Sequence, residues 1–205
     1  MIEWNENNAE ATIWLNPLVE KQTFKFAVFA DRDGTLLKHV DYLGNPDSVE
    51  VLPGVGDAIR KVLCNGGAFF LFTNQSGVGR GYYSLADVHA CHERMFKLMQ
   101  IPLRRISGYC IAPGLPQGND PYRKPSPLFI QEAMQHVNVS LGKVHMIGDT
   151  KVDLETAQSA GVAGWLVGCG KSEAVKGHMD QKLHYEYTFA EDFPNCIESI
   201  IAGEN

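Results

Sequence analysis

The sequence predicts an α/β fold, a doubly wound parallel sheet built from alternating strands and helices. Short, continuous apolar runs of the kind found in strands buried on both faces recur along the chain. Between them lie segments whose apolar residues return every three or four positions, the pattern of a helix packed on one side. This alternation specifies a parallel sheet with helices on both faces. At 205 residues, the chain has the length of one well-buried domain and is short for two.

The first elements follow a segment that we interpret as separate from the domain. Residues 1–24 form an N-terminal extension with a short helix around Ala9–Leu15, and residues 25–205 form the domain. Phe26–Ala30 is the first apolar strand. Pro53 begins a helix that runs to about Cys64, because proline suits a first helical turn and two glycines follow the segment.

The middle of the chain repeats the pattern. Ala68–Phe72 is a second buried strand, and Ile106–Ala112 is a third. The helix between them begins at Ser84, where Asp87 three residues later is close to a capping box. Its inward face carries Leu85, Val88, Cys91, Met95 and Met99.

The last third continues in the same way. A helix begins at Ser126 and turns three apolar residues inward: Ile130, Met134 and Val137. Val144–Ile147 is a strand and is followed by a helix over about Lys151–Ser159. A short strand at Gly164–Val167 and a final helix over Glu191–Ile201 complete the domain.

Composition excludes several functional classes. The net charge of −6 lacks the basic footprint of a protein that binds nucleic acid tightly, so no nucleic-acid partner is expected. No apolar run approaches the roughly 18 to 20 residues of a membrane span, and residues 1–10 do not read as a signal peptide. The five cysteines form no CxxC pair, which favours a reduced, cytoplasmic compartment. We expect residues 171–187 to be polar surface.

Polar segments stand where strands end. Residues 31–35 (DRDGT), 73–77 (TNQSG) and 148–153 (GDTKVD) each follow an apolar strand, and residues 123–125 (RKP) precede the Ser126 helix. Any one segment could be an ordinary cap or turn. Ligands of doubly wound folds bind at the carboxyl ends of the strands, so the four together predict an active site at that edge.

These four segments, in this order, resemble the motifs of haloacid dehalogenase (HAD) superfamily hydrolases. The resemblance spans about residues 25 to 165. The run from Thr73 to Gly81 (TNQSGVGRG) and the Arg123-Lys124-Pro125 triplet are similar to the branch of histidinol-phosphate and heptose-bisphosphate phosphatases.

The resemblance implies phosphatase chemistry. Asp31 would be the nucleophile and would form an aspartyl-phosphate. Asp33 would protonate the leaving oxygen and then deprotonate the attacking water, and its presence favours phosphoryl transfer over dehalogenation. Thr73, Asn74 and Lys124 would donate hydrogen bonds to the transferring phosphoryl group.

A magnesium ion is the expected cofactor, because clustered carboxylates repel each other and a phosphate dianion. By resemblance its ligands would be Asp31, the backbone carbonyl of Asp33, and Asp149. We expect Asp153, about one helical turn after Asp149, to support the metal shell or to orient Lys124.

Other polar residues receive weaker assignments. Arg80 and Arg123 could each bind a second anionic group or a sugar hydroxyl, or could be solvated side chains. Arg32 is expected to point away from the catalytic acids, since alternate residues of an extended segment share a side. Five histidines lack metal-ligand spacing, and we interpret them as structural: His39, His89, His92, His136 and His145.

The spacing of the motifs leaves no room for a cap domain. Only residues 36–52 separate the first motif from the next helix, enough for a flap, so substrate selection is assigned to the loops at Lys38–Val49, Gly79–Tyr83 and Pro113–Tyr122. Many heptose-bisphosphate phosphatases carry a cysteine- and histidine-rich zinc loop at the last position. Here only Cys110 remains, so no structural zinc is expected.

The sequence therefore predicts a phosphomonoesterase of a small metabolite, with a sugar (bis)phosphate such as heptose 1,7-bisphosphate as the first candidate. Histidinol phosphate, a polynucleotide 3′-phosphate end, or a non-catalytic binding module on the same fold are the alternatives. We expect a monomer or a weak homo-oligomer.

Overall fold

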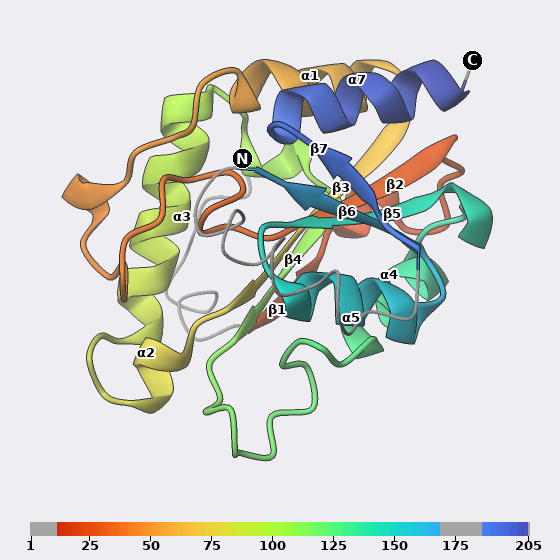
Figure 1. The fold of residues 1–205 in the computed structure, drawn as a ribbon. Coiled ribbons are helices and arrows are strands. Elements are labelled where there is room, and N and C mark those ends of the chain that lie inside the picture. The colour runs from red at the N-terminus through yellow and green to blue at the C-terminus, as the bar shows by residue number, and fades with distance from the viewer. Residues whose placement is uncertain (1–11, 169–185, 205) are drawn as a thin grey trace.

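The computed structural model describes residues 12–168 and 186–204 (Figure 1). Its strands are β1 (Ile13–Leu15), β2 (Phe26–Ala30), β3 (Gly67–Asn74), β4 (Gly108–Ala112), β5 (Val144–Gly148), β6 (Ala163–Val167) and β7 (Thr188–Ala190). Its α-helices are α1 (Val55–Cys64), α2 (Ser76–Gly79), α3 (Leu85–Met99), α4 (Leu128–His136), α5 (Lys151–Ala160) and α7 (Phe193–Glu204). The predicted alternation of strands and helices is confirmed.

The strands form one seven-stranded sheet in the order β1-β4-β3-β2-β5-β6-β7. All neighbours are parallel except β1, which runs antiparallel to β4. At the centre, Ala30 pairs with Leu71 on one side and with Ile147 on the other. This register brings the carboxyl ends of β2, β3 and β5 to the same edge, as the sequence predicts for the polar segments.

Helices cover both faces of the sheet, so the doubly wound class is confirmed (Figure 1). Helices α1, α3 and α7 pack over one apolar layer, and α4 and α5 pack over the other. The second layer contains a stack of Phe29 on Phe70, with ring centroids 4.6 Å apart, and Phe129 meets both rings edge-on. These three rings are fully buried, which fixes β2 and β3 beneath the site.

The helix predicted around Ala9–Leu15 is wrong over the residues that the structure describes. Residues 13–15 form β1 instead, where Trp14 stacks on Tyr109 with ring centroids 5.7 Å apart. Asn16, directly after β1, is fully buried and donates to the carbonyl oxygen of Ile106. The end of the predicted extension is thus an edge strand of the sheet, fixed by partners about 90 residues away. Residues 1–11 lie outside the described residues, as do 169–185, most of the segment predicted as polar surface.

Several element boundaries follow from local chemistry. Ser84 caps α3 through a capping box with Asp87, as predicted. Helix α4 begins at Leu128, two residues after the predicted start, with Pro127 at its cap. The one-turn helix α2 and the short strand β7 were not predicted, because each is too short to show a period. Within the described residues, none of the helices is long and apolar enough to cross a membrane.

Candidate active site

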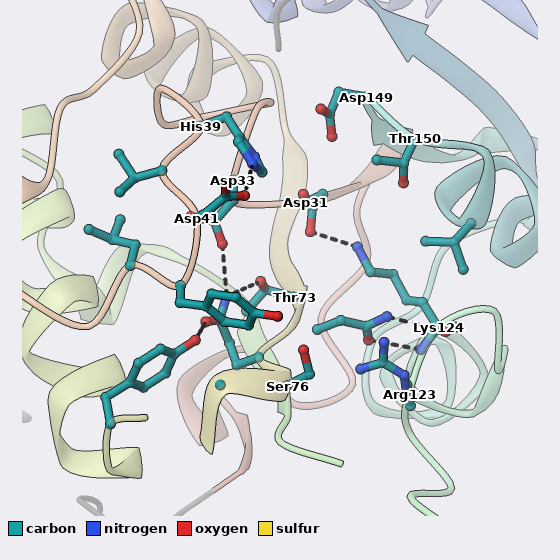
Figure 2. Close-up of a pocket in the computed structure, with 18 residues that line it drawn as sticks. Asp31, Asp33, His39, Asp41, Thr73, Ser76, Arg123, Lys124, Asp149 and Thr150 are labelled. Carbon is teal, nitrogen blue, oxygen red and sulfur yellow. Dashed lines mark hydrogen bonds and ion pairs between the residues drawn. The ribbon is translucent and has the colours of Figure 1, made fainter. Parts of the chain in front are cut away.

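A pocket of about 370 Å³ opens at the edge where β2, β3 and β5 end (Figure 2). Its walls come from four separate parts of the chain. They are formed by residues of the β2 end and the following flap, of the β3 end and α2, of the segment before α4, and of the β5 end: Asp31, Asp33, His39, Val40, Asp41, Tyr42, Leu43, Thr73, Asn74, Gln75, Ser76, Gly77, Tyr83, Arg123, Lys124, Asp149, Thr150 and Val152. The pocket gathers most of the polar residues singled out in the sequence.

Lys124 joins two carboxylates at the floor of the pocket. Its Nζ lies 2.6 Å from Oδ1 of Asp31 and 2.5 Å from Oδ1 of Asp153, and all three side chains are buried. Burial raises the pKa of Asp31 to about 7, against the opposing effect of the Lys124 charge. Burial by itself would lower the pKa of Lys124, but the charges of Asp153 and Asp31 outweigh it and raise the pKa. Lys124 is therefore a fixed cation beside Asp31.

Asp153 is fully engaged on both of its oxygens. While Oδ1 faces Lys124, Oδ2 accepts from the backbone N–H of Thr150 at 3.1 Å and from its hydroxyl at 2.5 Å. This capping box begins α5 and fixes the rotamer of Asp153. The geometry corresponds to one of the two roles considered for Asp153, that of orienting Lys124.

Asp149 supplies a carboxylate without a counter-charge. Its Oδ1 is buried and has no hydrogen-bond partner among the residues that the structure describes. Burial, followed by the charges of Asp31 and Asp153, raises the pKa of Asp149 to about 8. Gly34 makes room for this carboxylate: its φ of +87° suits glycine, and a Cβ at this position would collide with the Asp149 side chain.

The three buried carboxylates fit a divalent cation. One oxygen each of Asp31, Asp149 and Asp153 lie within 4.8 Å of one another. Lys124 is the one cationic side chain that the structure places in contact with this cluster among the described residues, so negative charge remains uncompensated. An all-oxygen donor set with room for water and a substrate phosphate is the environment in which Mg²⁺ is usually bound.

Asp33 is held from two sides. Arg32 donates from Nε to both carboxylate oxygens of Asp33, at 3.1 Å each, and its Nη2 lies 3.0 Å from Oδ2. Gln75 donates from Nε2 to the same Oδ2 at 2.8 Å. The expectation that Arg32 points away from the acids is wrong: the guanidinium is fully buried, and its length lets it fold back onto its neighbour.

Thr73 and Asn74 lie at the end of β3, next to Lys124. Thr73 is buried, and its hydroxyl accepts from Nε2 of Gln75 at 2.9 Å. The Asn74 side chain is used within the protein. It accepts from the backbone N–H of Lys124 at 3.0 Å and donates to the Lys124 carbonyl at 3.2 Å. This pair of bonds clamps the segment that carries Lys124 against β3.

The two arginines considered for substrate binding, Arg80 and Arg123, differ in their position relative to the pocket. Arg123 lines the pocket, and its Nη1 donates to the carbonyl of Gly114 at 2.9 Å. Arg80 is exposed and is not part of the lining. The loop Pro113–Tyr122, predicted to select substrate, also contributes nothing to the lining as described. The loop contacts the pocket indirectly, because its Gly114 carbonyl accepts the hydrogen bond from Arg123.

Sequence reasoning missed three kinds of residue around the pocket. Gln75 lies in the Thr73–Gly81 motif and Tyr83 lies just after it, but nothing in the sequence indicates a role for either until their hydrogen-bond partners are known. Thr150 was quoted with the β5 motif, but no role was assigned to it. His39 was interpreted as structural, but it lies on the pocket rim, 3.1 Å from Oδ1 of Asp41 (Figure 2). In the sequence, the only indication of a role for His39 and Asp41 was their position in the flap between the first motif and α1.

Known proteins are similar to this chain over most of its length. Residues 121–193 match the family model described as HAD-hydrolase-like. The D-glycero-D-manno-heptose-1,7-bisphosphate 7-phosphatase of Thermosynechococcus vestitus is 31% identical over 185 residues, which cover 85% of this chain and 94% of the relative. The corresponding 7-phosphatase of Haemophilus ducreyi is 34% identical over 167 residues, covering 78% and 92% of the two chains.

Solved structures show the same similarity. The crystal structure of D,D-heptose 1,7-bisphosphate phosphatase from B. bronchiseptica, complexed with magnesium and phosphate, superimposes with a TM-score of 0.76 at 28% identity. The match covers 87% of this chain and 99% of that one.

Proposed function

Because this chain belongs to the haloacid dehalogenase-like phosphatases, within the family of the heptose-bisphosphate phosphatases, we propose that it hydrolyses a small phosphate monoester through a covalent intermediate on Asp31. One juxtaposition supports this reaction most directly. The Asp31 carboxylate lies 2.6 Å from the buried ammonium of Lys124, beside the unpartnered oxygen of Asp149, in a pocket at the carboxyl edge of the sheet.

In the first half of the reaction, a carboxylate oxygen of Asp31 attacks phosphorus. The bond between phosphorus and the ester oxygen breaks, its electron pair stays on the leaving oxygen, and Asp33 gives that oxygen a proton. Lys124 and the Thr73 hydroxyl donate to the phosphoryl oxygens, where negative charge is spread in the transition state. The product alcohol then leaves the pocket.

In the second half, the Asp33 carboxylate takes a proton from water, and the resulting oxygen attacks the phosphorus of the aspartyl-phosphate. The bond from phosphorus to Asp31 breaks, and inorganic phosphate is released. The contacts from Arg32 and Gln75 keep the Asp33 carboxylate turned toward the pocket for both proton transfers. Lys124 remains paired with Asp153, which holds the ammonium in place between turnovers.

The cofactor proposed for this site is Mg²⁺. Asp31 and Asp149, with the backbone carbonyl of Asp33, would hold it, and Asp153 would fix the surrounding shell by holding Thr150 and Lys124. When bound, the ion neutralises the carboxylates and the phosphate dianion so that the two can approach. The crystallised relative from B. bronchiseptica contains magnesium and phosphate.

We propose a sugar bisphosphate as the substrate, with heptose 1,7-bisphosphate as the first candidate, because the relatives compared above are named for it. The flap of residues 36–52 stands in place of a cap domain. Its residues 39–43 line the pocket, which is open to a polar, hydroxylated molecule. Histidinol phosphate and a polynucleotide 3′-phosphate end remain alternative substrates. The described lining of the pocket contains four aspartates and two permanently charged cations, Arg123 and Lys124, which disfavours a long polyanion.

Phosphate release tests the proposal. The panel contains sugar bisphosphates, sugar monophosphates, histidinol phosphate, a 3′-phosphorylated oligonucleotide and an aryl phosphate, each with Mg²⁺ and with a chelator. We expect metal-dependent turnover that Asp31→Asn abolishes and that Asp57→Asn, at an exposed aspartate of α1, leaves unchanged. Mass spectrometry after acid quenching should find phosphate on Asp31. If the folded protein releases phosphate from no member of the panel, the proposed function is wrong.

A further inference from the structure

The side-chain amide of Gln75 is the centre of a buried hydrogen-bonded chain below the pocket. Gln75 is only 3% exposed. Its Nε2 donates to Oδ2 of Asp33 at 2.8 Å and to Oγ1 of Thr73 at 2.9 Å, and its Oε1 accepts from the Tyr83 hydroxyl at 2.8 Å. Both amide hydrogens and the carbonyl are therefore engaged, and two of the three partners belong to the proposed reaction.

The Asp33 carboxylate, which can only accept, determines which way this amide faces, and the Tyr83 hydroxyl holds the amide from its carbonyl side. In the flipped amide, the Gln75 carbonyl would meet the carboxylate of Asp33, acceptor against acceptor, in a buried place where such a contact is costly. The Tyr83 ring is fixed in turn, because it lies directly against Gly77 of α2 and Gly44 of the flap, where any Cβ would collide with it. The hydroxyl is thus presented to Gln75 by a ring that packs between these two glycines.

The Asp33 carboxylate is held between this amide and Arg32. Arg32 is fully buried and reaches both carboxylate oxygens from one side, while Gln75 reaches Oδ2 from the other. The Asp33 side chain keeps 19% of its surface exposed, and this part faces the pocket, of which Asp33 is a lining residue. The carboxylate is therefore held in one orientation.

The same amide also directs the Thr73 hydroxyl. Since Thr73 Oγ1 accepts from Gln75, its own hydrogen must point to a different acceptor. Thr73 lines the pocket, so a phosphoryl oxygen bound there is the acceptor that the reaction supplies.

We propose that Gln75 and Tyr83 are positioning residues: Gln75 orients the Asp33 carboxylate for proton transfer to the leaving oxygen and turns the Thr73 hydroxyl toward the phosphate, and Tyr83 keeps the Gln75 amide in the required orientation. This inference rests on the proposed function and assigns further residues to the same site. Neither side chain is expected to touch the transferring phosphoryl group.

Two substrates with different leaving groups distinguish misplacement of Asp33 from a general loss of active-site structure. An alkoxide, the leaving group of a sugar phosphate, needs a proton during bond breaking, whereas p-nitrophenolate departs without one. Misplacing Asp33 must therefore slow sugar phosphates more than p-nitrophenyl phosphate. The ratio kcat/KM is the right measurement, because it reports every step through the release of the alcohol or phenol.

The variants are Tyr83→Phe and Gln75→Met, with Tyr187→Phe as the matched control. Tyr83→Phe removes one hydroxyl and keeps the ring between its two glycines, and Gln75→Met keeps the length of the side chain but removes all three hydrogen bonds. Tyr187 is a partly exposed tyrosine directly before β7, outside the lining of the pocket and outside the loops assigned to substrate selection. For the sugar phosphate, we expect kcat/KM to fall about tenfold in Tyr83→Phe and about a hundredfold in Gln75→Met. The first is a partial loss, and the second is at the lower end, of the about 10²-fold to 10⁴-fold that general acid catalysis contributes.

For p-nitrophenyl phosphate, we expect Tyr83→Phe to lose less than about threefold. Gln75→Met should lose less on this substrate than on the sugar phosphate, and Tyr187→Phe should change neither substrate. Equal losses on both substrates would mean that the network is merely structural, and no loss on the sugar phosphate in Tyr83→Phe would overturn the role of Tyr83. If Gln75→Met does not fold, Tyr83→Phe decides the question alone. Failure of the proposed function itself is distinguishable, because the wild-type protein would then release phosphate from neither compound.

Discussion

Replacing Asp149 by Asn tests whether this carboxylate is kept for a cation. The substitution preserves the shape of a buried side chain but removes its negative charge, and the oxygen Oδ1 has no partner among the described residues to lose. In metal-free protein we therefore expect Asp149→Asn to stabilise the fold at high pH. With Mg²⁺ present, the same variant should lose both activity and the stabilisation that the ion provides.

The magnitude follows from the pKa of Asp149, which burial and the charges of Asp31 and Asp153 raise from 3.8 to about 8. Between pH 3.8 and about pH 8, Asp149 holds a proton in the folded protein that it has released in the unfolded chain. The associated stability is complete below pH 3.8 and is lost as the pH rises toward about 8, with a slope of about 1.4 kcal/mol per pH unit. Between about pH 6 and pH 8, the wild-type protein should thus lose about 2 kcal/mol that Asp149→Asn retains.

Urea unfolding followed by circular dichroism measures this difference, with a chelator present and at several pH values between about 6 and 8. Asp47→Asn, an exposed aspartate, serves as the matched control and should follow the wild type. Added Mg²⁺ should stabilise the wild type most at the highest pH, because the ion competes with the proton. Wild-type stability that does not fall with pH, or equal stabilisation of Asp149→Asn by Mg²⁺, would refute the reasoning.

Two further predictions concern Lys124 and the packing of Gly77 against Tyr83. Lys124→Met should lower kcat/KM at least about 10²-fold to 10³-fold, the usual cost of removing one preorganised donor, while Lys61→Met, at an exposed ion pair of α1, should leave kcat/KM unchanged. Gly77→Ala should destabilise the fold by about 1–3 kcal/mol in urea unfolding, because its Cβ would overlap the Tyr83 ring. Gly142→Ala, where a Cβ would meet nothing within 4 Å, should change stability by less than about 0.5 kcal/mol, and an equal loss in both glycine variants would contradict the packing argument.

The sheet and the position of the site could be predicted because each strand–helix unit carries its own signal. The apolar runs show which strands are buried on both faces, and the polar residues that follow Ala30, Phe72 and Ile147 necessarily meet at one edge of a parallel sheet. Neither inference requires knowledge of a distant contact. The same holds for the start of α3, where Ser84 and Asp87 cap each other within one turn.

The features that sequence reasoning missed depend on partners that are far away in the chain. β1 has only three residues, and its antiparallel partner lies in β4, so no local period could indicate it. Arg32 was misplaced because strand alternation gives the direction of a Cβ, not the reach of a long side chain that folds back onto Asp33. Gln75 has a role only through Asp33, 42 residues earlier, and Tyr83, eight residues later.

The short strands at both margins of the sheet bear on how this protein behaves at high concentration. In the described part of the chain, β1 and β7 have three residues each, whereas the inner strand β3 has eight. A short edge strand offers few unpaired N–H and C=O groups to which a strand of another molecule could pair. Removing the residues up to Leu15 would instead uncover β4, five consecutive buried residues, and expose a template for edge-to-edge aggregation. The segment before β2 thus protects the folded molecule from its own copies, independently of anything it does for catalysis.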